Sequence, residues 1–215
     1  MDAERGTIIP STESGKNYLH NTAQSIATRP GLPDEPGTKD LYARYFTGHL
    51  IKIDPVTRVG EFVSETMPYT ESYLVFDPHD RNIMYIAYPQ LHCIGKFNLE
   101  TMEHTVFVGD FGISGHADGL LSDARFSSPC QLAAGPDGNL YVADRNNHCI
   151  RMIDITTGMV STVVGKPGIA GYQNGIAEDA LFEGPTGVSV VETPDGIVMY
   201  IADCDNGTVR KLMQQ

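Results

Sequence analysis

Apolar residues in this chain occur in short runs that are separated by residues typical of turns. Ile83 to Ala87, Leu140 to Ala143 and Val198 to Ala202 are such runs, and Gly, Pro, Asp and Asn lie between them. Short apolar runs bounded by turn residues are typical of buried strands, whereas amphipathic helices repeat their apolar positions every three to four residues. A repeat of apolar positions every three to four residues is not sustained in this sequence. The pattern therefore predicts an all-β chain.

The runs group into four units with a similar internal order. Each unit contains a short Tyr-Ile-Ala-like strand followed by a polar turn and a further strand. Radially repeated units of four short antiparallel strands are the plan of a β-propeller. We therefore expect one propeller domain over residues 1–215 with about four blades, the last of them one strand short. The expected repeats cover residues 24–63, 73–109, 131–165 and 187–212.

A segment of fifteen residues occurs twice and supports this repeat organisation. Residues 115–129 return as residues 171–185, at an offset of 56 without a gap, and six of the fifteen positions are identical. Self-similarity at a fixed period of this size indicates a repeat architecture. The identical pairs are Gly115/Gly171, Gly119/Gly175, Asp123/Asp179, Ala124/Ala180, Phe126/Phe182 and Pro129/Pro185. We expect both phenylalanines to be buried between blades.

The way in which the ring closes has more than one solution. Residues 1–23 are polar and irregular, apart from the short β-like piece Thr7 to Ile9. This piece could supply the outer strand that the fourth unit lacks, which would give a ring of four blades. The alternatives are a part of a six-bladed ring and a partial ring that a partner completes.

Charge and composition exclude several classes of function. The chain has 15 Lys and Arg against 27 Asp and Glu, a formal net charge of −12. An acidic protein repels phosphate backbones, so we expect no nucleic-acid partner. We expect no membrane insertion, because the chain has no run of 18 apolar residues, and we recognise no secretory signal at its N-terminus. The four cysteines lack CxxC spacing, and Cys93 and Cys149 are expected to be buried filler.

An acidic and a basic residue recur together at the hairpin of two units. Asp144 and Arg151 are seven residues apart, as are Asp203 and Arg210. If each turn is centred on two residues, the partners face each other across the hairpin and contribute about 0.2–1 kcal/mol. The second unit has Tyr88 and Gly95 at these positions. The acidic and the basic residue are both absent from the second unit, as expected if each residue is present only to pair with the other.

Three histidines occupy the same inter-strand turn in successive units. His49, His92 and His148 could suggest zinc, but equivalent turns of different blades are spread around a ring, and ligands must lie about 2 Å from one ion. We therefore predict no metal site and expect each ring to pack on the next blade. The sequence has no nucleophile elbow or phosphate-binding loop, so we also predict no catalytic residues and no cofactor.

Two segments resemble a known family of repeats. Asp137 to Ile153 (DGNLYVADRNNHCIRMI) and Tyr200 to Leu212 (YIADCDNGTVRKL) look like NHL repeats. The resemblance implies a propeller, commonly of six blades. The Asp- and Gly-rich connectors preceding these segments resemble those of bacterial cell-surface NHL proteins. The resemblance thus implies an extracytoplasmic or cell-surface location.

The connectors and the inter-strand turns are expected to share one face of the propeller. Aromatic and hydrogen-bonding side chains on a rigid scaffold suit recognition of a protein loop or a sugar. We therefore favour a non-catalytic binding or scaffold module for a protein or carbohydrate ligand. The alternative for Asp118 and Asn174 is stabilisation of their own loops. The candidate ligand-binding residues are Phe111, His116, Asp118, Tyr172, Gln173 and Asn174.

An enzyme is the main alternative to a binding module. Propeller hydrolases and lyases of the gluconolactonase-like or amidating-lyase-like type hold a metal in the central channel with acids and histidines of the innermost strands. The predicted inner strands Gln131 to Ala134 and Gly187 to Val190 contain no Asp, Glu or His. This composition counts against the enzyme.

Overall fold

The computed structural model describes residues 23–31, 40–57 and 59–213 and has an all-β fold. The chain divides into two compact units, Met1–Thr70 and Glu71–Gln215. Four antiparallel sheets are present in the described residues, one in the first unit and three in the second. This confirms the predicted all-β, propeller-like architecture. The prediction of a single domain stays a prediction.

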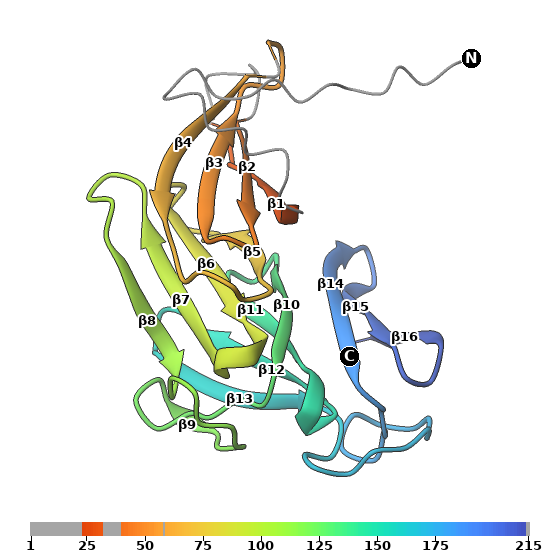
Figure 1. The fold of residues 1–215 in the computed structure, drawn as a ribbon. Helices are drawn as coiled ribbons and strands as arrows, with labels where there is room; N and C mark the ends of the chain where they lie inside the picture. The colour runs from red at the N-terminus through yellow and green to blue at the C-terminus, as the bar shows by residue number, and fades with distance from the viewer. Residues whose placement is uncertain (1–22, 32–39, 58, 214–215) are drawn as a thin grey trace. The chain divides into compact units, whose positions relative to one another are not determined.

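The first unit is one sheet of four antiparallel strands (Figure 1). Its strands are β1 (Ala23–Thr28), β2 (Leu41–Tyr45), β3 (His49–Ile53) and β4 (Gly60–Glu65), in this order in the sheet. Ala43, Tyr45 and Ile51 form its small apolar cluster. The buried Arg44 donates hydrogen bonds to the Thr66 hydroxyl at 2.8 Å and to the Thr70 carbonyl at 2.9 Å.

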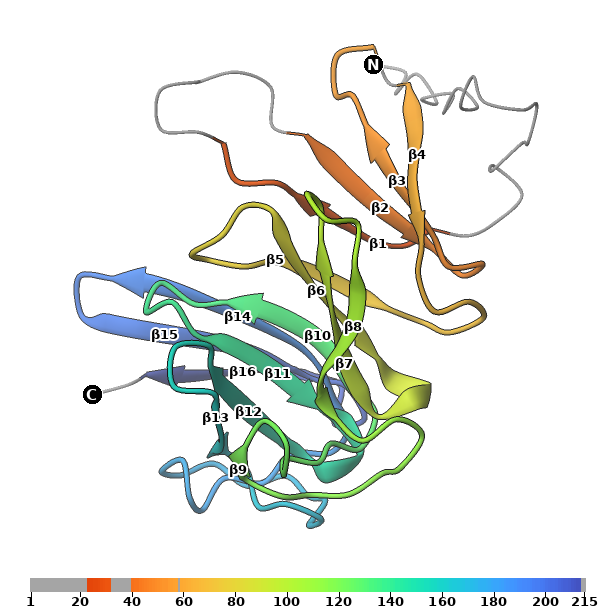
Figure 2. The same ribbon diagram turned by 90° about the vertical axis from the view of Figure 1, so that its left-hand side faces the viewer.

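The second unit contains three sheets, which we call the second, third and fourth blades (Figures 1 and 2). The second blade consists of β5 (Tyr73–Phe76), β6 (Ile83–Tyr88), β7 (Cys93–Asn98) and β8 (His104–Gly109). The third consists of β10 (Pro129–Ala134), β11 (Leu140–Asp144), β12 (Cys149–Asp154) and β13 (Met159–Val164), with the short β9 (Gly119–Leu120) added beyond β13. The fourth consists of β14 (Pro185–Thr193), β15 (Gly196–Asp203) and β16 (Thr208–Met213).

Apolar side chains of neighbouring blades interleave to form the core of the second unit. Phe126 lies in the cluster that joins the second and third blades, and Phe182 lies in the cluster that joins the third and fourth. Both side chains are buried, as predicted. The strand β6 is buried along its whole length, and its residues Ile83, Tyr85 and Ala87 pack in the cluster shared with the third blade. Blade-to-blade packing therefore explains the continuous apolar runs of the sequence.

The fourth blade has three strands in the described part of the chain, with β16 at its outer edge. The predicted closing strand, Thr7 to Ile9, falls outside the described residues. Its pairing with the fourth blade remains a prediction.

Replacing Phe182 with Ala should lower the free energy of unfolding of the second unit by about 3–5 kcal/mol, because it removes a buried aromatic ring and leaves a cavity. Denaturant unfolding of the wild type and of Phe182→Ala measures this difference. Phe111→Ala is the control, since the Phe111 side chain is largely exposed. Equal losses in the two variants would contradict the blade interface described above.

Candidate functional site

Two connectors, the first at residues 110–128 before the third blade and the second at residues 165–184 before the fourth, are each held by an arginine of the blade that follows. The Arg151 side chain, on β12, is fully buried and donates to the carbonyls of Ala117 and Arg125 at 2.7 and 2.9 Å. It also contacts the Asp118 carboxylate at 2.6 Å, and its guanidinium lies over the Phe126 ring. One strand residue thus fixes three positions of the preceding connector.

The carboxylate of Asp144 is the partner of this arginine inside the blade. It accepts from Arg151 at 3.0 Å, from the Asn147 amide at 2.8 Å and from the backbone N–H of Ser127 at 2.8 Å. Burial raises the pKa of Asp144 to about 6, while these donors act in the opposite direction. Asn147 in turn donates to the Gly115 carbonyl, so the carboxylate organises the hairpin and the connector together.

The fourth blade repeats this network with equivalent residues. Asp203 accepts from Arg210 at 2.9 Å, from Asn206 at 3.0 Å and from the backbone N–H of Glu183 at 2.8 Å. Arg210 donates to the carbonyl oxygens of Leu181 and Gln173 and to the side-chain oxygen of Asn174. The duplicated sequences therefore form duplicated hydrogen-bond networks.

The predicted register of these hairpins was wrong. Asp144 is opposite Cys149, and Arg151 is opposite Val142, so the charged partners meet diagonally rather than directly. The cause is the turn, in which a 3₁₀ helix at Arg145–Asn147 precedes His148 in the left-handed conformation. The pair is also fully buried, so the small energy expected for an exposed cross-strand pair does not apply.

The second blade fills the same space with a ring instead of an ion pair. The Tyr88 side chain is buried, and its hydroxyl forms a 3.0 Å hydrogen bond with His104. A Cβ atom added at Gly95 would lie 2.9 Å from the Tyr88 ring and 2.7 Å from His104. Tyr88 and Gly95 therefore depend on each other, which explains why both differ from the other blades.

The turn histidines His92 and His148 contact the next blade, as predicted. The ring of His92 accepts a hydrogen bond from the backbone N–H of Ser128, and that of His148 accepts one from Gly184, each at 3.1 Å. The ring of His49, in the first unit, forms a 2.9 Å hydrogen bond with the Thr47 hydroxyl and lies edge-on to the Phe62 ring. Across the described residues, no group of three or more His, Cys, Asp or Glu side chains is placed to hold a metal ion.

The predicted ligand-binding residues fall into two groups and one separate residue. His116 and Asp118 meet at Thr162 of β13, where both side chains form hydrogen bonds with its hydroxyl. Burial and the positive charge of Arg151 lower the pKa of His116, and the negative charge of Asp118 acts in the opposite direction. Tyr172, Gln173 and Asn174 gather around Arg210, and the exposed Tyr172 ring packs against its guanidinium. Phe111 is exposed in the first connector.

Sequence reasoning missed a set of exposed aliphatic residues on the same connectors. They occur in equivalent pairs at the 56-residue offset, which is the signal that could have identified them. The two connectors lie at the same end of the second unit (Figures 1 and 2). Their exposed aliphatic pairs are Ile113/Ile169 and Leu120/Ile176.

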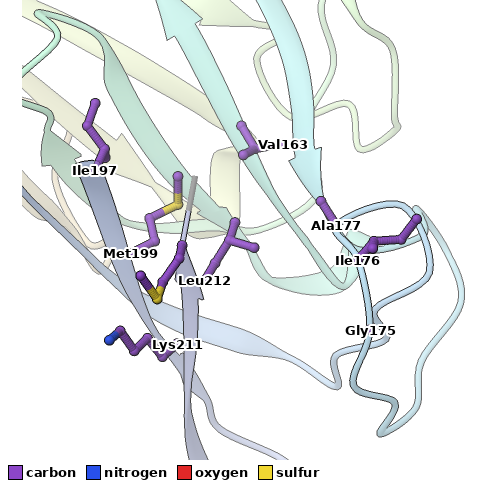
Figure 3. A pocket seen from close by; sticks show the side chains of 9 residues that line it. Val163, Gly175, Ile176, Ala177, Ile197, Met199, Lys211 and Leu212 are labelled. Atoms are coloured by element: carbon purple, nitrogen blue, oxygen red, sulfur yellow. The ribbon is translucent and has the colours of Figure 1, made fainter. Parts of the chain in front are cut away.

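An apolar groove of about 620 Å³ runs beside β16. Val163 lines one side, Met199 and Leu212 line another, and Ile176 of the second connector lies nearby (Figure 3). A smaller polar hollow of about 290 Å³ is lined by Tyr172, Asn174 and Arg210, among others. Among the described residues, no helix is long and apolar enough to cross a membrane.

Arg151→Met should lower the free energy of unfolding by about 3–5 kcal/mol, because it leaves the buried Asp144 carboxylate without its charged partner. The matched control is Arg145→Met, which removes a partly exposed ion pair with Asp205 and should cost at most about 1 kcal/mol. Chemical denaturation measures both. Similar losses for the two variants would contradict a special role of the buried pair.

Comparison with known proteins places one NHL repeat in the chain. Residues 126–151 match the family model described as NHL repeat. NHL repeat-containing protein 2 of Bos taurus is 35% identical over 82 residues, which are 38% of this chain and 11% of that protein. The chain thus matches only a small part of the curated relative.

Solved structures show the same fold over most of the chain. A structural genomics protein of unknown function from Bacteroides thetaiotaomicron has a TM-score of 0.78 and 22% identity, over 90% of this chain and 47% of that one. An auxiliary nutrient binding protein from the same species has a TM-score of 0.71 and 25% identity, over 87% of this chain and 46% of that one. The chain spans about half the length of these structures, and it carries an NHL repeat within a propeller-like fold.

Proposed function

We propose that the chain is a non-catalytic binding module whose ligand surface is formed by its two long connectors. Exposed apolar side chains recur at equivalent positions of both connectors, and this repetition is the observation that carries the proposal. An exposed apolar patch on a folded protein favours an interaction surface, and we infer that these recurring positions form one. The buried arginines hold the connectors in place, so a ligand would meet a preorganised surface.

The chemistry of this surface favours a protein ligand. Its exposed aliphatic side chains, Ile113, Leu120, Ile169 and Ile176, suit apolar packing against another protein. The candidate residues His116, Tyr172 and Asn174 would add hydrogen bonds at its edge.

A carbohydrate or another small nutrient is the second candidate ligand. The exposed ring of Tyr172 offers a flat face, and the structural neighbour described as an auxiliary nutrient binding protein supports a nutrient. The resemblance to bacterial cell-surface NHL proteins leads us to propose an extracytoplasmic location, which suits either ligand. A propeller hydrolase or lyase remains the alternative function, and one bound metal ion per chain in elemental analysis would favour it.

The double variant His116→Ala/Tyr172→Ala should fold and lose most ligand binding, because it removes one polar or aromatic side chain from each connector. Wild type and variant are applied to an oligosaccharide array, and both are used to capture proteins from an extract of the encoding organism. Circular dichroism checks that the variant is folded.

Met102→Ala is the matched control, since Met102 is an exposed apolar residue in the turn between β7 and β8. It should retain every interaction of the wild type. Binding that survives in the double variant and is lost in Met102→Ala would place the ligand surface elsewhere.

A further inference from the structure

Two apolar side chains lie next to each other at the outer rim of the third blade, where β9 runs along β13 (Figure 1). Leu120 of β9 is opposite Met159 of β13, and Met159 is opposite Asp154 of β12. Residues directly opposite each other in antiparallel strands share one face, with Cβ atoms about 4.5–5.5 Å apart. Leu120 is 53% exposed and Met159 is 44% exposed. The three side chains therefore form one row, with two exposed apolar members and one acidic member.

A tight turn in the first connector adds a second carboxylate to this row. The Leu120 carbonyl accepts hydrogen bonds from the backbone N–H groups of Asp123 and Ala124, each at 2.9 Å. Asp123 is exposed, whereas Ala124 is buried in the core between the second and third blades. The turn is thus anchored on its inner side. The second connector repeats it, since the Ile176 carbonyl accepts from the backbone N–H of Asp179 at 3.0 Å. We call Leu120, Asp123, Asp154 and Met159 the rim patch.

The exposure of the rim patch follows from its place in a blade. The second-blade residue equivalent to Met159 is Glu103, because the registers of β7 with β8 and of β12 with β13 match at the 56-residue offset. Glu103 is exposed, although the third blade, which follows the second, has its outer strand in place. A residue at this position therefore reaches solvent beside a neighbouring blade of four strands.

The two carboxylates of the rim patch carry uncompensated negative charge. Within the described part of the chain, neither Asp123 nor Asp154 forms an ion pair. Asp154 accepts hydrogen bonds from the backbone N–H groups of Thr156 and Thr157, each at 2.9 Å. These bonds lower the pKa of Asp154, so its carboxylate is charged at neutral pH.

The connectors as a whole are also acidic. They contain six acidic and two basic residues, which gives a net charge of −4 with histidine neutral. Both basic residues are already paired, Arg125 with Asp110 at 3.3 Å and Lys166 with Asp179 at 3.2 Å. The charge that remains for a ligand is therefore negative. The chain itself carries a net charge of −12, so electrostatic repulsion disfavours a second copy as the occupant.

We propose that the rim patch binds a basic, amphipathic segment of a partner protein. Apolar side chains of the segment would pack on Leu120 and Met159, and its Lys or Arg side chains would pair with Asp123 and Asp154. Apolar contacts exclude water from the charges at their edge, and complementary charge selects the partner and speeds association. The inference rests on the binding function proposed above and specifies the chemistry of the protein ligand at the connector surface.

The test uses three labelled peptides of equal length and the full-length protein, with binding followed by fluorescence anisotropy. The first peptide combines Leu and Lys in an amphipathic helical pattern, the second has Glu in place of Lys, and the third has Ser in place of Leu. We expect saturable binding of the Leu/Lys peptide and at least about tenfold weaker binding of the other two, because each lacks one of the complementary features. Absence of saturable binding of the Leu/Lys peptide, or equal binding of either of the others, would overturn the proposal.

Neutralising the two acids locates the site. Asp123→Asn/Asp154→Asn should weaken binding of the Leu/Lys peptide at least about tenfold, since it removes both charges and keeps the side-chain shapes. Glu100→Gln/Glu103→Gln is the matched control, because it removes two exposed charges at the equivalent corner of the second blade. The control should bind the peptide as the wild type does. Equal losses in the two variants would reveal general attraction to an acidic protein and would overturn the proposal.

A third variant distinguishes failure of this inference from failure of the proposed function. Leu120→Ser/Met159→Ser removes the apolar part of the rim patch, and circular dichroism checks that it is folded. If it lost the peptide while the Asn variant kept it, the surface would bind without selecting basic residues, so the inference would be wrong and the binding function would stand. If both variants kept the peptide, the rim patch would not be the site. Dimerisation of the wild type that is lost in the Ser variant, measured by sedimentation, would assign the patch to a second copy and overturn the proposal.

Discussion

The buried ion pair between the second and third strands of a blade is the interaction on which the connectors depend. Burying two charges costs more than their attraction returns unless further hydrogen bonds satisfy them. Here Asp144 and Arg151 obtain those bonds from the hairpin and from the backbone of the connector. The backbone of the connector therefore takes the place of water around the two buried charges. The ion pair and the connector stabilise each other.

This arrangement separates the residues that stabilise the fold from the exposed residues of the connectors. Strand residues and the inward-facing side chains of the connectors, such as Phe126 and Phe182, form the core between blades. The outward-facing positions of the same connectors are free to vary, and they carry the exposed aliphatic residues. A loop that is anchored through its backbone can change its surface side chains without losing its shape. In the second blade, a buried tyrosine over a glycine occupies the place of the ion pair.

The two duplicated networks differ at one position beside the arginine. Asp118 and Asn174 occupy equivalent positions, and each contacts the arginine of its blade. The side chain of Asp118 also binds β13, whereas Asn174 lines an open hollow beside β16. The loop-stabilising alternative considered for these residues is compatible with their contacts to the arginines. A role for Asn174 in binding would come from the hollow that it lines with Tyr172 and Arg210.

The sequence by itself determined the number of units, most strand positions and the burial of the duplicated phenylalanines, because short apolar runs and a repeated segment can be recognised without knowing the tertiary structure. It also indicated that Asp144 and Arg151 belong together, since they recur and are replaced jointly. Only the tertiary structure decided their register, because the 3₁₀ turn before His148 leaves no clear signal in composition. Likewise, the groove beside β16 depends on how the described strands assemble, and that is a property of the sheets rather than of any segment.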